Sequence, residues 1–320
     1  MSKNEVVMNP RKVAVVGCGF VGSASAFALM QSGLFSEMVL IDANFKKAEG
    51  EAFDISHGVP FTRPIKIYAG DYDDLADAAI VVITAGAAQK PGETRLDLVH
   101  KNINIFKSII PEIVKRDFQG ILLIVANPVD ILTYTALKLS GYAPNRVIGS
   151  GTVLDTARLK ERLGEHLEVD SRSVHAFIVG EHGDSEIAAW SSANVSGIPL
   201  HDFCEMRGHH DHEGATAEIA EKVKNSAYEI IQRKGATYYG IAMSVKRICE
   251  AIIRDERSIL PISTMMDGEY GIKDVVLSMP SIVGAEGFIS KVPISLSEDE
   301  IKALNKSAET LKSVLEEALE

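Results

Sequence analysis

The stretch Val13-Ala14-Val15-Val16-Gly17-Cys18-Gly19-Phe20-Val21-Gly22 joins an apolar run to a Gly-x-Gly-x-x-Gly turn near the start of the chain. The valine-rich run indicates a buried strand, and the residues from Gly22 to Ser32 indicate a helix. A turn with this spacing between a strand and a helix predicts a dinucleotide-binding loop. Gly17 permits the tight bend, Gly19 lets a pyrophosphate approach the backbone, and Gly22 allows the helix to pack closely on the strand.

A carboxylate at the end of the next predicted strand narrows the choice of dinucleotide. Asp42 lies 20 residues after Gly22, directly after the strand predicted over Met38–Ile41. A carboxylate there accepts hydrogen bonds from both ribose hydroxyls and repels a 2′-phosphate, so we expect NAD as the cofactor in preference to NADP. Flavin proteins share the glycine turn, but the acid–base residues found later in the chain suit nicotinamide better.

The rest of the chain divides into two patterns. Strands and helices alternate up to Gly149, which predicts an α/β doubly wound parallel sheet, the Rossmann domain, over residues 1–149. Residues 150–320 predict a second, α+β catalytic domain. The predicted strands of the first domain are Val13–Val16, Met38–Ile41, Ile65–Tyr68, Ile80–Ile83, Ile121–Val125 and Arg146–Ile148, with a helix over Val99–Arg116.

Several elements are expected in the second domain. A helix begins near Thr152, and a capping box of Ser297 and Glu300 opens the C-terminal helix. The other expected elements are strands over His175–Val179 and Glu186–Ala189, a polar loop over 207–214, and helices over Ala215–Gln232 and Tyr238–Ile253.

A second group of residues points to acid–base chemistry. Asp155 and Arg158 are three positions apart on the predicted helix and therefore project from one face. His182, in Gly180-Glu181-His182-Gly183-Asp184-Ser185, supplies an imidazole that Asp155 can orient and hold protonated. Arg158 can bind a carboxylate through two hydrogen bonds. These are the groups needed to move a proton on and off the oxygen of a small carboxylic acid.

Residues 86–97 are expected to form a lid over the substrate. They follow the strand Ile80–Ile83 at the ligand-binding edge of the sheet, and glycines flank their polar residues. Arg95 would arrive with this lid and polarise the reacting carbonyl.

Composition excludes several function classes. The 33 basic and 44 acidic residues give a net charge of −11, which argues against nucleic-acid or anionic-membrane partners. The three cysteines have no paired spacing, and the N-terminal residues show no signal peptide, so a cytoplasmic protein is expected. His209, His210 and His212 lie in a polar segment without neighbouring ligand spacing, so we expect no metal.

Taken together, these motifs resemble the lactate/malate dehydrogenase family, and within it the bacterial L-lactate dehydrogenases. The resemblance runs from the first strand to the C-terminal helix. The motifs that carry it are Gly-Phe-Val-Gly at 19–22, Gln-Lys-Pro-Gly-Glu-Thr-Arg-Leu-Asp-Leu at 89–98, Ala-Asn-Pro-Val-Asp at 126–130, Leu-Asp-Thr-Ala-Arg at 154–158 and Gly-Glu-His-Gly-Asp-Ser at 180–185.

The resemblance implies a role for each matched residue. His182 would be the proton donor and acceptor with Asp155 as its partner, Arg158 would bind the substrate carboxylate, and Arg95 would contact the carbonyl. Gln89, Asn127 and Thr237 would line the substrate pocket. The implied cofactor contacts are Gly17, Gly19, Val21, Gly22, Asp42, Lys47, Tyr72, Gly86, Ala87, Ser108, Asn127 and Ser150.

Gln89 favours pyruvate as the substrate. Family members that act on malate carry an arginine at this position, and a neutral glutamine would leave the second carboxylate of oxaloacetate unpaired in a closed site. The reaction implied is pyruvate + NADH + H⁺ giving L-lactate + NAD⁺, reversibly, as the last step of a lactate fermentation. A malate or longer-chain 2-hydroxyacid dehydrogenase is the alternative.

The resemblance also implies a homotetramer and an allosteric site. Allosteric relatives bind fructose 1,6-bisphosphate through an arginine two residues after the substrate arginine and a histidine seven before the catalytic one. This chain has His175 at the second position but Lys160 at the first. Lysine keeps the charge and loses the bidentate fork, so activation stays open.

Overall fold

The computed structural model describes residues 7–87, 92 and 94–319. Its strands are β1 (Asn9–Val16), β2 (Glu37–Ile41), β3 (Lys66–Ala69), β4 (Ala78–Ile83), β5 (Ile121–Ile124), β6 (Val147–Gly149), β7 (Val174–His175), β8 (Ile178–Val179), β9 (Ile187–Ala188), β10 (Asn194–Val195), β11 (Ile198–Pro199), β12 (Ser258–Asp267), β13 (Lys273–Gly284) and β14 (Gly287–Lys291). Its α-helices are α1 (Phe20–Ser32), α2 (Phe45–Ser56), α3 (Arg95–Val114), α4 (Val129–Ser140), α5 (Val153–Leu167), α6 (Leu200–Met206), α7 (His212–Lys234), α8 (Tyr239–Ile253) and α9 (Glu298–Leu319).

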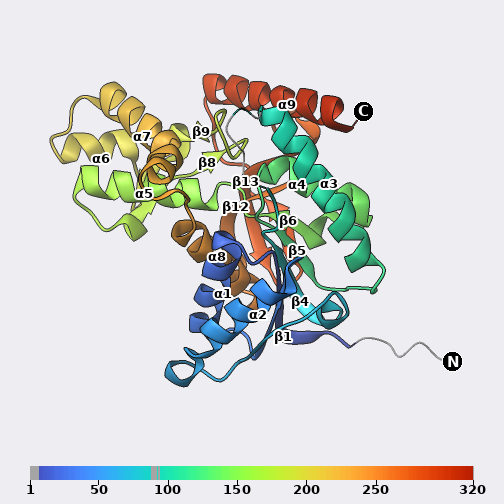
Figure 1. The fold of residues 1–320 in the computed structure, drawn as a ribbon. Coiled ribbons are helices and arrows are strands. Elements are labelled where there is room, and N and C mark those ends of the chain that lie inside the picture. Colours follow the sequence, from blue (N-terminus) through green and yellow to red (C-terminus); the bar gives the residue numbers. More distant parts are fainter. Residues whose placement is uncertain (1–6, 88–91, 93, 320) are drawn as a thin grey trace.

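A nine-stranded sheet forms the centre of the molecule (Figure 1), with the strand order β14-β13-β12-β6-β5-β4-β1-β2-β3. The six strands from β1 to β6 are parallel, so the predicted doubly wound fold is confirmed. Sequence analysis assigned no strands between residues 254 and 296. Here β12, β13 and β14 extend the sheet in antiparallel fashion beyond β6, so the sheet includes residues on both sides of Gly149.

Helices cover both faces of this sheet because its strands are apolar on both faces. Along β1, Val13 and Val15 face one core, which α1, α2 and α8 cover. Ala14 and Val16 face the other core, which α3, α4 and α9 cover. The same alternation continues along β2, β4 and β5. The apolar runs in the sequence therefore correspond to strands buried between two helical layers.

A smaller lobe stands beside the sheet. Figure 1 shows α5, α6 and α7 together at its upper left, and they enclose a third core with β7, β8 and β10. Leu159 and Leu163 of α5 pack there against Val174 of β7 and Val223 of α7. Because α5 also contacts β12, it connects this lobe to the main sheet.

Two helix starts differ from the prediction by three residues or more. α3 begins at Arg95, four residues before the predicted Val99, because Thr94 and Asp97 form a capping box. Residues 95–97 of the predicted lid therefore belong to a helix. α7 begins at His212, where Asp211 caps it, so the predicted loop over 207–214 ends three residues early. The capping box of Ser297 and Glu300 forms as predicted. Within the described part of the chain, no helix has the length and apolar content that a membrane span requires.

Candidate active site

The glycine turn between β1 and α1 leaves a space in front of its backbone. Gly17 has a φ of +99°, and a Cβ atom on it would lie 2.5 Å from the backbone nitrogen of Ala85. A Cβ atom on Gly22 would lie 1.8 Å from the carbonyl oxygen of Gly17. Both positions therefore require glycine. Around Gly19, by contrast, no heavy atom of the described residues lies within 4 Å of where a Cβ would be. The free N–H groups at the start of α1 adjoin this space, as a pyrophosphate needs.

The residues expected to bind the cofactor gather at one edge of the sheet. Six parallel strands end there, and the order of the strands reverses between β1 and β4, which is where doubly wound folds bind ligands. The expected residues that follow these strands are Gly17 and Gly19 after β1, Asp42 after β2, Tyr72 after β3, Gly86 and Ala87 after β4, Asn127 after β5, and Ser150 after β6. Val21 and Gly22 lie on α1, Lys47 on α2 and Ser108 on α3.

Asp42 faces the glycine turn. One of its carboxylate oxygens accepts the backbone N–H of Cys18 at 2.7 Å, and the other accepts that of Asn44 at 2.9 Å. Each oxygen has a further lone pair, so the carboxylate can also accept ribose hydroxyls. These features together fit the adenosine end of NAD.

Asn102 links two of the cofactor loops, a role that the sequence did not indicate. It is 1% exposed on α3. Its side chain accepts the N–H of Ala87 at 2.7 Å and donates to the carbonyl of Asn127 at 2.7 Å. The loops after β4 and β5 are thereby held at a fixed separation.

Asp155 joins the imidazole and the guanidinium. Its Oδ2 lies 2.5 Å from Nδ1 of His182, and its Oδ1 accepts a hydrogen bond of 2.8 Å from Nη1 of Arg158. The Asp155 side chain is 3% exposed, whereas that of His182 is 25% exposed. The buried carboxylate therefore orients both cationic groups while His182 remains accessible through its other ring nitrogen.

Two threonines hold the histidine segment against α5. The hydroxyl of Thr152 donates to the carbonyl of Ile178 at 2.6 Å, and the hydroxyl of Thr156 accepts the N–H of Ile178 at 2.9 Å. Gly180 then exchanges two backbone hydrogen bonds of 2.9 Å with Ser278 of β13. The segment that carries His182 is thus fixed between α5 and the antiparallel part of the sheet.

A second buried carboxylate supports the backbone of His182. Asp130 on α4 accepts the N–H of His182 at 2.8 Å and the hydroxyl of Ser263 at 2.5 Å. Burial raises the pKa of Asp130 to about 6, although these two hydrogen bonds oppose the shift. Asp130 lies in one of the quoted motifs, but the sequence alone gave no indication of its contact with His182.

The charges of the site favour a protonated His182. Burial disfavours the imidazolium, but the neighbouring Asp155 outweighs it and raises the pKa of His182 to about 9. Burial likewise opposes ionisation of Asp155, yet His182 and Arg158 hold its pKa below the ordinary value. At neutral pH the site therefore contains an imidazolium and a guanidinium that share one carboxylate.

A pocket of about 390 Å³ opens onto these residues. Asn127, Asp155, Arg158 and His182 line it from one side, and Lys224, Ala227, Tyr228 and Ile231 of α7 line it from another. Glu186, which sequence analysis did not select, also lines the pocket. One of its carboxylate oxygens lies within 4.8 Å of a ring nitrogen of His182 and of a carboxylate oxygen of Asp155. Burial and the nearby Asp155 raise the pKa of Glu186 to about 8.

Other residues that the sequence predicted for the site do not line this pocket, or lie outside the part of the chain that the structure describes. Thr237 lies between α7 and α8 and is not among the described residues that line the pocket. Ser108 is exposed on α3, and its hydroxyl donates to Ile105 of the same helix. Lys160 on α5 is half-buried, and His175 on β7 is exposed. Gln89 lies outside the described residues, and for Arg95 only the backbone, at the start of α3, is described.

Comparison with protein-family models finds two matches that together cover most of the chain. The NAD-binding domain of lactate/malate dehydrogenases matches residues 11–149. The alpha/beta C-terminal domain of the same enzymes matches residues 152–320.

Individual proteins agree with this result. The chain is 55% identical over 315 residues to an L-lactate dehydrogenase of Acetivibrio thermocellus, covering 98% of both chains. It is 54% identical over 305 residues to L-lactate dehydrogenase 1 of Clostridium acetobutylicum, covering 95% of this chain and 97% of the other. Among solved structures, it superposes with a TM-score of 0.93 on the ligand-bound minor L-lactate dehydrogenase of Enterococcus mundtii, at 46% identity over 96% of this chain and 98% of that one.

Proposed function

The chain belongs to the lactate/malate dehydrogenase family, and from this we propose how its residues carry out the reaction of an L-lactate dehydrogenase. Such an enzyme transfers a hydride reversibly between NADH and pyruvate, giving L-lactate and NAD⁺. The chain is an NAD-dependent oxidoreductase of this kind, since its similarity to L-lactate dehydrogenases extends over nearly its whole length. A malate or longer-chain 2-hydroxyacid dehydrogenase is not favoured.

His182 acts as the general acid for pyruvate reduction. The nicotinamide cofactor, when bound, supplies the hydride as NADH or accepts it as NAD⁺. His182 donates the proton to the carbonyl oxygen and takes it back from lactate in the reverse direction. The observation that carries this assignment is the contact of 2.5 Å between His182 Nδ1 and Asp155 Oδ2. Because Asp155 occupies Nδ1, the other ring nitrogen is the one that faces the pocket.

Arg158 binds the substrate carboxylate. It lines the pocket beside His182, and the one hydrogen bond that it makes to the described residues, to Asp155, leaves other N–H groups of the guanidinium available. A bidentate contact would fix the orientation of pyruvate, with its carbonyl oxygen toward the imidazole. Asn127 lines the same pocket and Thr237 completes it in this proposal.

The residues near the start of α3 complete the site in this proposal. Arg95, from the first turn of α3, polarises the carbonyl, and Gln89 contacts the methyl end of the substrate. The loop before α3 would close over pyruvate, exclude water and so strengthen these electrostatic contacts. Residues 1–149 form the NAD-binding domain and residues 150–320 the substrate domain.

The cofactor contacts follow the edge of the sheet. The pyrophosphate lies against Gly17, Gly19 and the start of α1, and the adenosine ribose lies against Asp42. The further contacts proposed are Val21, Gly22, Lys47, Tyr72, Gly86, Ala87, Ser108, Asn127 and Ser150.

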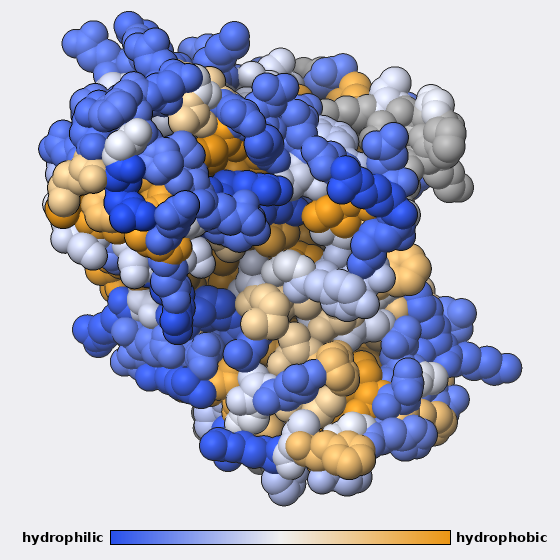
Figure 2. All heavy atoms as spheres, turned by 90° about the vertical axis from the view of Figure 1, so that its left-hand side faces the viewer, coloured by the Kyte–Doolittle hydropathy of each residue, from blue (hydrophilic) through white to orange (hydrophobic). Residues whose placement is uncertain are grey.

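Assembly into a homotetramer is part of the proposal. Large apolar side chains are exposed on α1, α2 and α8, including Phe27 at 46%, Phe53 at 61% and Met243 at 56%. Figure 2 shows apolar surface spread over the lower half of the face where these helices lie. Exposed apolar surface of this extent is typical of a protein interface. Light scattering that gave the mass of a monomer would contradict the assembly.

Activation by fructose 1,6-bisphosphate through Lys160 and His175 is a further part of the proposal. Both belong to elements that pack together, α5 and β7, but burial lowers the pKa of Lys160. Titration with the sugar bisphosphate should lower the KM for pyruvate or stabilise the tetramer. If neither the KM for pyruvate nor the stability of the tetramer changes, Lys160 and His175 do not form an activator site.

Substrate choice tests the function. We expect NADH absorbance to fall rapidly with pyruvate and slowly with oxaloacetate or 2-oxoisocaproate. Gln89→Arg should shift the ratio of kcat/KM toward oxaloacetate by at least about a hundredfold, because it supplies a partner for the second carboxylate. Gln89→Met, which adds no charge, is the control and should still reject oxaloacetate. A wild-type preference for oxaloacetate would overturn the proposal.

A further inference from the structure

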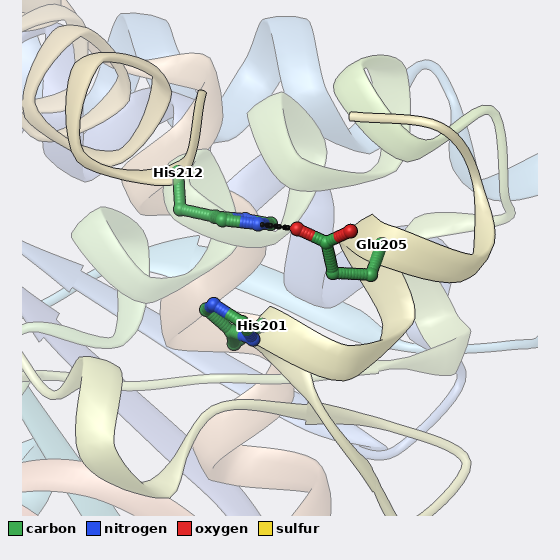
Figure 3. Close-up of side chains that lie close together, drawn as sticks. All are labelled: His201, Glu205 and His212. Atoms are coloured by element: carbon green, nitrogen blue, oxygen red, sulfur yellow. Dashed lines mark hydrogen bonds and ion pairs between the residues drawn. The ribbon is translucent and has the colours of Figure 1, made fainter. Parts of the chain in front are cut away.

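A cluster of histidines lies on the small lobe, away from the active site. His201 and Glu205 are on α6, and His212 is the first residue of α7. His201 and Glu205 are four positions apart, so they project from the same face of α6. Figure 3 shows the Glu205 carboxylate directed at the His212 ring and the His201 ring beneath both. Each of the three offers one nitrogen or oxygen atom within 4.8 Å of the others.

The distances are close to those of a metal centre. Nε2 of His212 lies 2.7 Å from Oε1 of Glu205. Two ligands of a tetrahedral Zn²⁺ with bonds of about 2.0–2.1 Å lie about 3.3 Å apart, so a modest side-chain rotation would admit the ion in place of the shared proton. The side chains of His201 and Glu205 are 66% and 45% exposed, so an ion can reach them and they can rotate.

Neighbouring groups prepare these side chains to bind a cation. Both carboxylate oxygens of Glu205 lie within hydrogen-bonding distance of a histidine ring nitrogen, one of His212 and one of His210. His210 Nδ1 lies 2.8 Å from the second Glu205 oxygen and fixes its orientation. A carboxylate oxygen of Asp202 lies 3.5 Å from Nδ1 of His201, so a second carboxylate stands beside this ring.

His201 and His212 line a pocket of about 210 Å³ whose floor is apolar. Leu163, Trp190 and Ile219 line that floor.

We propose that His201, Glu205 and His212 form a binding site for a divalent transition-metal ion, with Zn²⁺ as the fitting ion. Two imidazoles and one carboxylate are the donor set that Zn²⁺ accepts with a fourth position left for water. The ion would connect α6 to the first residue of α7. Because α7 also lines the substrate pocket with Lys224 and Tyr228, the ion would stabilise the helix that forms one wall of the active site.

The sequence prediction of no metal site considered only the histidines of the polar segment 207–214. His209 and His210, which drew attention in the sequence, are not in the proposed ligand set. His201 and Glu205 lie in the preceding helix, and only the fold brings them to His212.

Zinc binding to the whole protein without an affinity tag tests the proposal. The chelator-treated protein is titrated with Zn²⁺ against a chromophoric chelator, and the thermal midpoint is followed in parallel. We expect one Zn²⁺ per chain and a raised midpoint. His201→Ala and Glu205→Gln should each weaken binding at least tenfold and remove the rise in the midpoint.

Two controls separate this site from others. His209→Ala removes a histidine of the same segment whose ring lies tilted against that of His166, at 4.4 Å between ring centroids, and binding should be unchanged. His182→Asn tests the active site, whose Asp155, His182 and Glu186 also lie within 4.8 Å of one another, and binding should again be unchanged. Absence of binding, an equal loss in His209→Ala, or a loss confined to His182→Asn would overturn the proposal. In the absence of metal, His201→Ala should reduce pyruvate at the wild-type rate.

Discussion

Asp155 couples substrate binding to proton transfer because its two oxygens contact different partners. One accepts from Arg158 and the other faces His182. Nearly complete burial would make this carboxylate costly if it were unpaired, and the two cationic neighbours offset that cost. The same contacts fix the direction of the imidazole and the guanidinium, so both functional groups depend on one side chain.

Arg158→Lys should raise the KM for pyruvate by about ten- to a hundredfold. Lysine keeps the positive charge but loses one hydrogen bond to a charged group, which contributes about 1.5–3 kcal/mol. Steady-state kinetics with varied pyruvate measure the effect. Arg162→Lys, one turn along α5 and 40% exposed, is the matched control and should change nothing. Equal KM values for the two variants would contradict the assignment of Arg158.

Glu186→Gln should move the alkaline limb of the pH profile for pyruvate reduction to lower pH. The Glu186 carboxylate, once ionised, raises the pKa of His182 in addition to the larger effect of Asp155. Its removal therefore makes the imidazole lose its proton at lower pH. The profile of kcat/KM against pH measures this shift. Glu165→Gln on the exposed side of α5 is the control, and a limb that stayed in place in Glu186→Gln would disprove the coupling.

At the level of elements, the position of His182 depends on contacts between α5, β8 and β13. Thr152 and Thr156 bond both backbone groups of Ile178, and Gly180 pairs with Ser278. The histidine is therefore placed by the backbone that precedes it as well as by Asp155.

Thr156→Val should lower both stability and kcat. The change keeps the shape of the side chain but leaves the buried N–H of Ile178 without its partner, at a cost of about 1–3 kcal/mol. Denaturant unfolding and pyruvate kinetics measure the two effects. Thr135→Val is the control, because the Thr135 hydroxyl donates to the carbonyl of Ile131 in its own helix. A Thr156→Val variant with wild-type kcat would show that this contact does not position His182.

The sequence predicted some elements much better than others, for physical reasons. The capping box joins Ser297 to a residue three positions away, and the glycine turn has a characteristic spacing between a strand and a helix, so both formed as expected. The strands β12 and β13 were missed. They contain Pro261 and Pro280, which lie opposite each other, and proline inside a run argues against a strand. Glu186 and Asn102 could not be selected because their contacts involve distant segments.

At the level of the whole molecule, three apolar cores are joined through shared elements. The second half of the chain supplies β12–β14 to the sheet of the first half, and α8 covers a face that the first half builds. The alternation of strands and helices indicated the parallel sheet, whereas nothing local indicated that residues beyond 254 would extend it.

The two halves should therefore unfold together. Trp190, the only tryptophan of the chain, packs against the core of the small lobe and reports on it. Its fluorescence and the far-ultraviolet circular dichroism of the whole chain should give coincident denaturant transitions. A tryptophan transition clearly separated from the dichroism would contradict the cooperative coupling.

The most direct test of the catalytic account is the pH dependence of kcat/KM for pyruvate reduction, in the wild type and in Asp155→Asn. Reduction needs protonated His182, and Asp155 raises the pKa of that imidazole to about 9. The wild-type rate should therefore stay level through neutral pH and fall as the pH passes about 9. In Asp155→Asn the fall should move to clearly lower pH, because the carboxylate that favours the imidazolium is gone. Identical alkaline limbs in the two proteins would contradict the assignment of the proton donor.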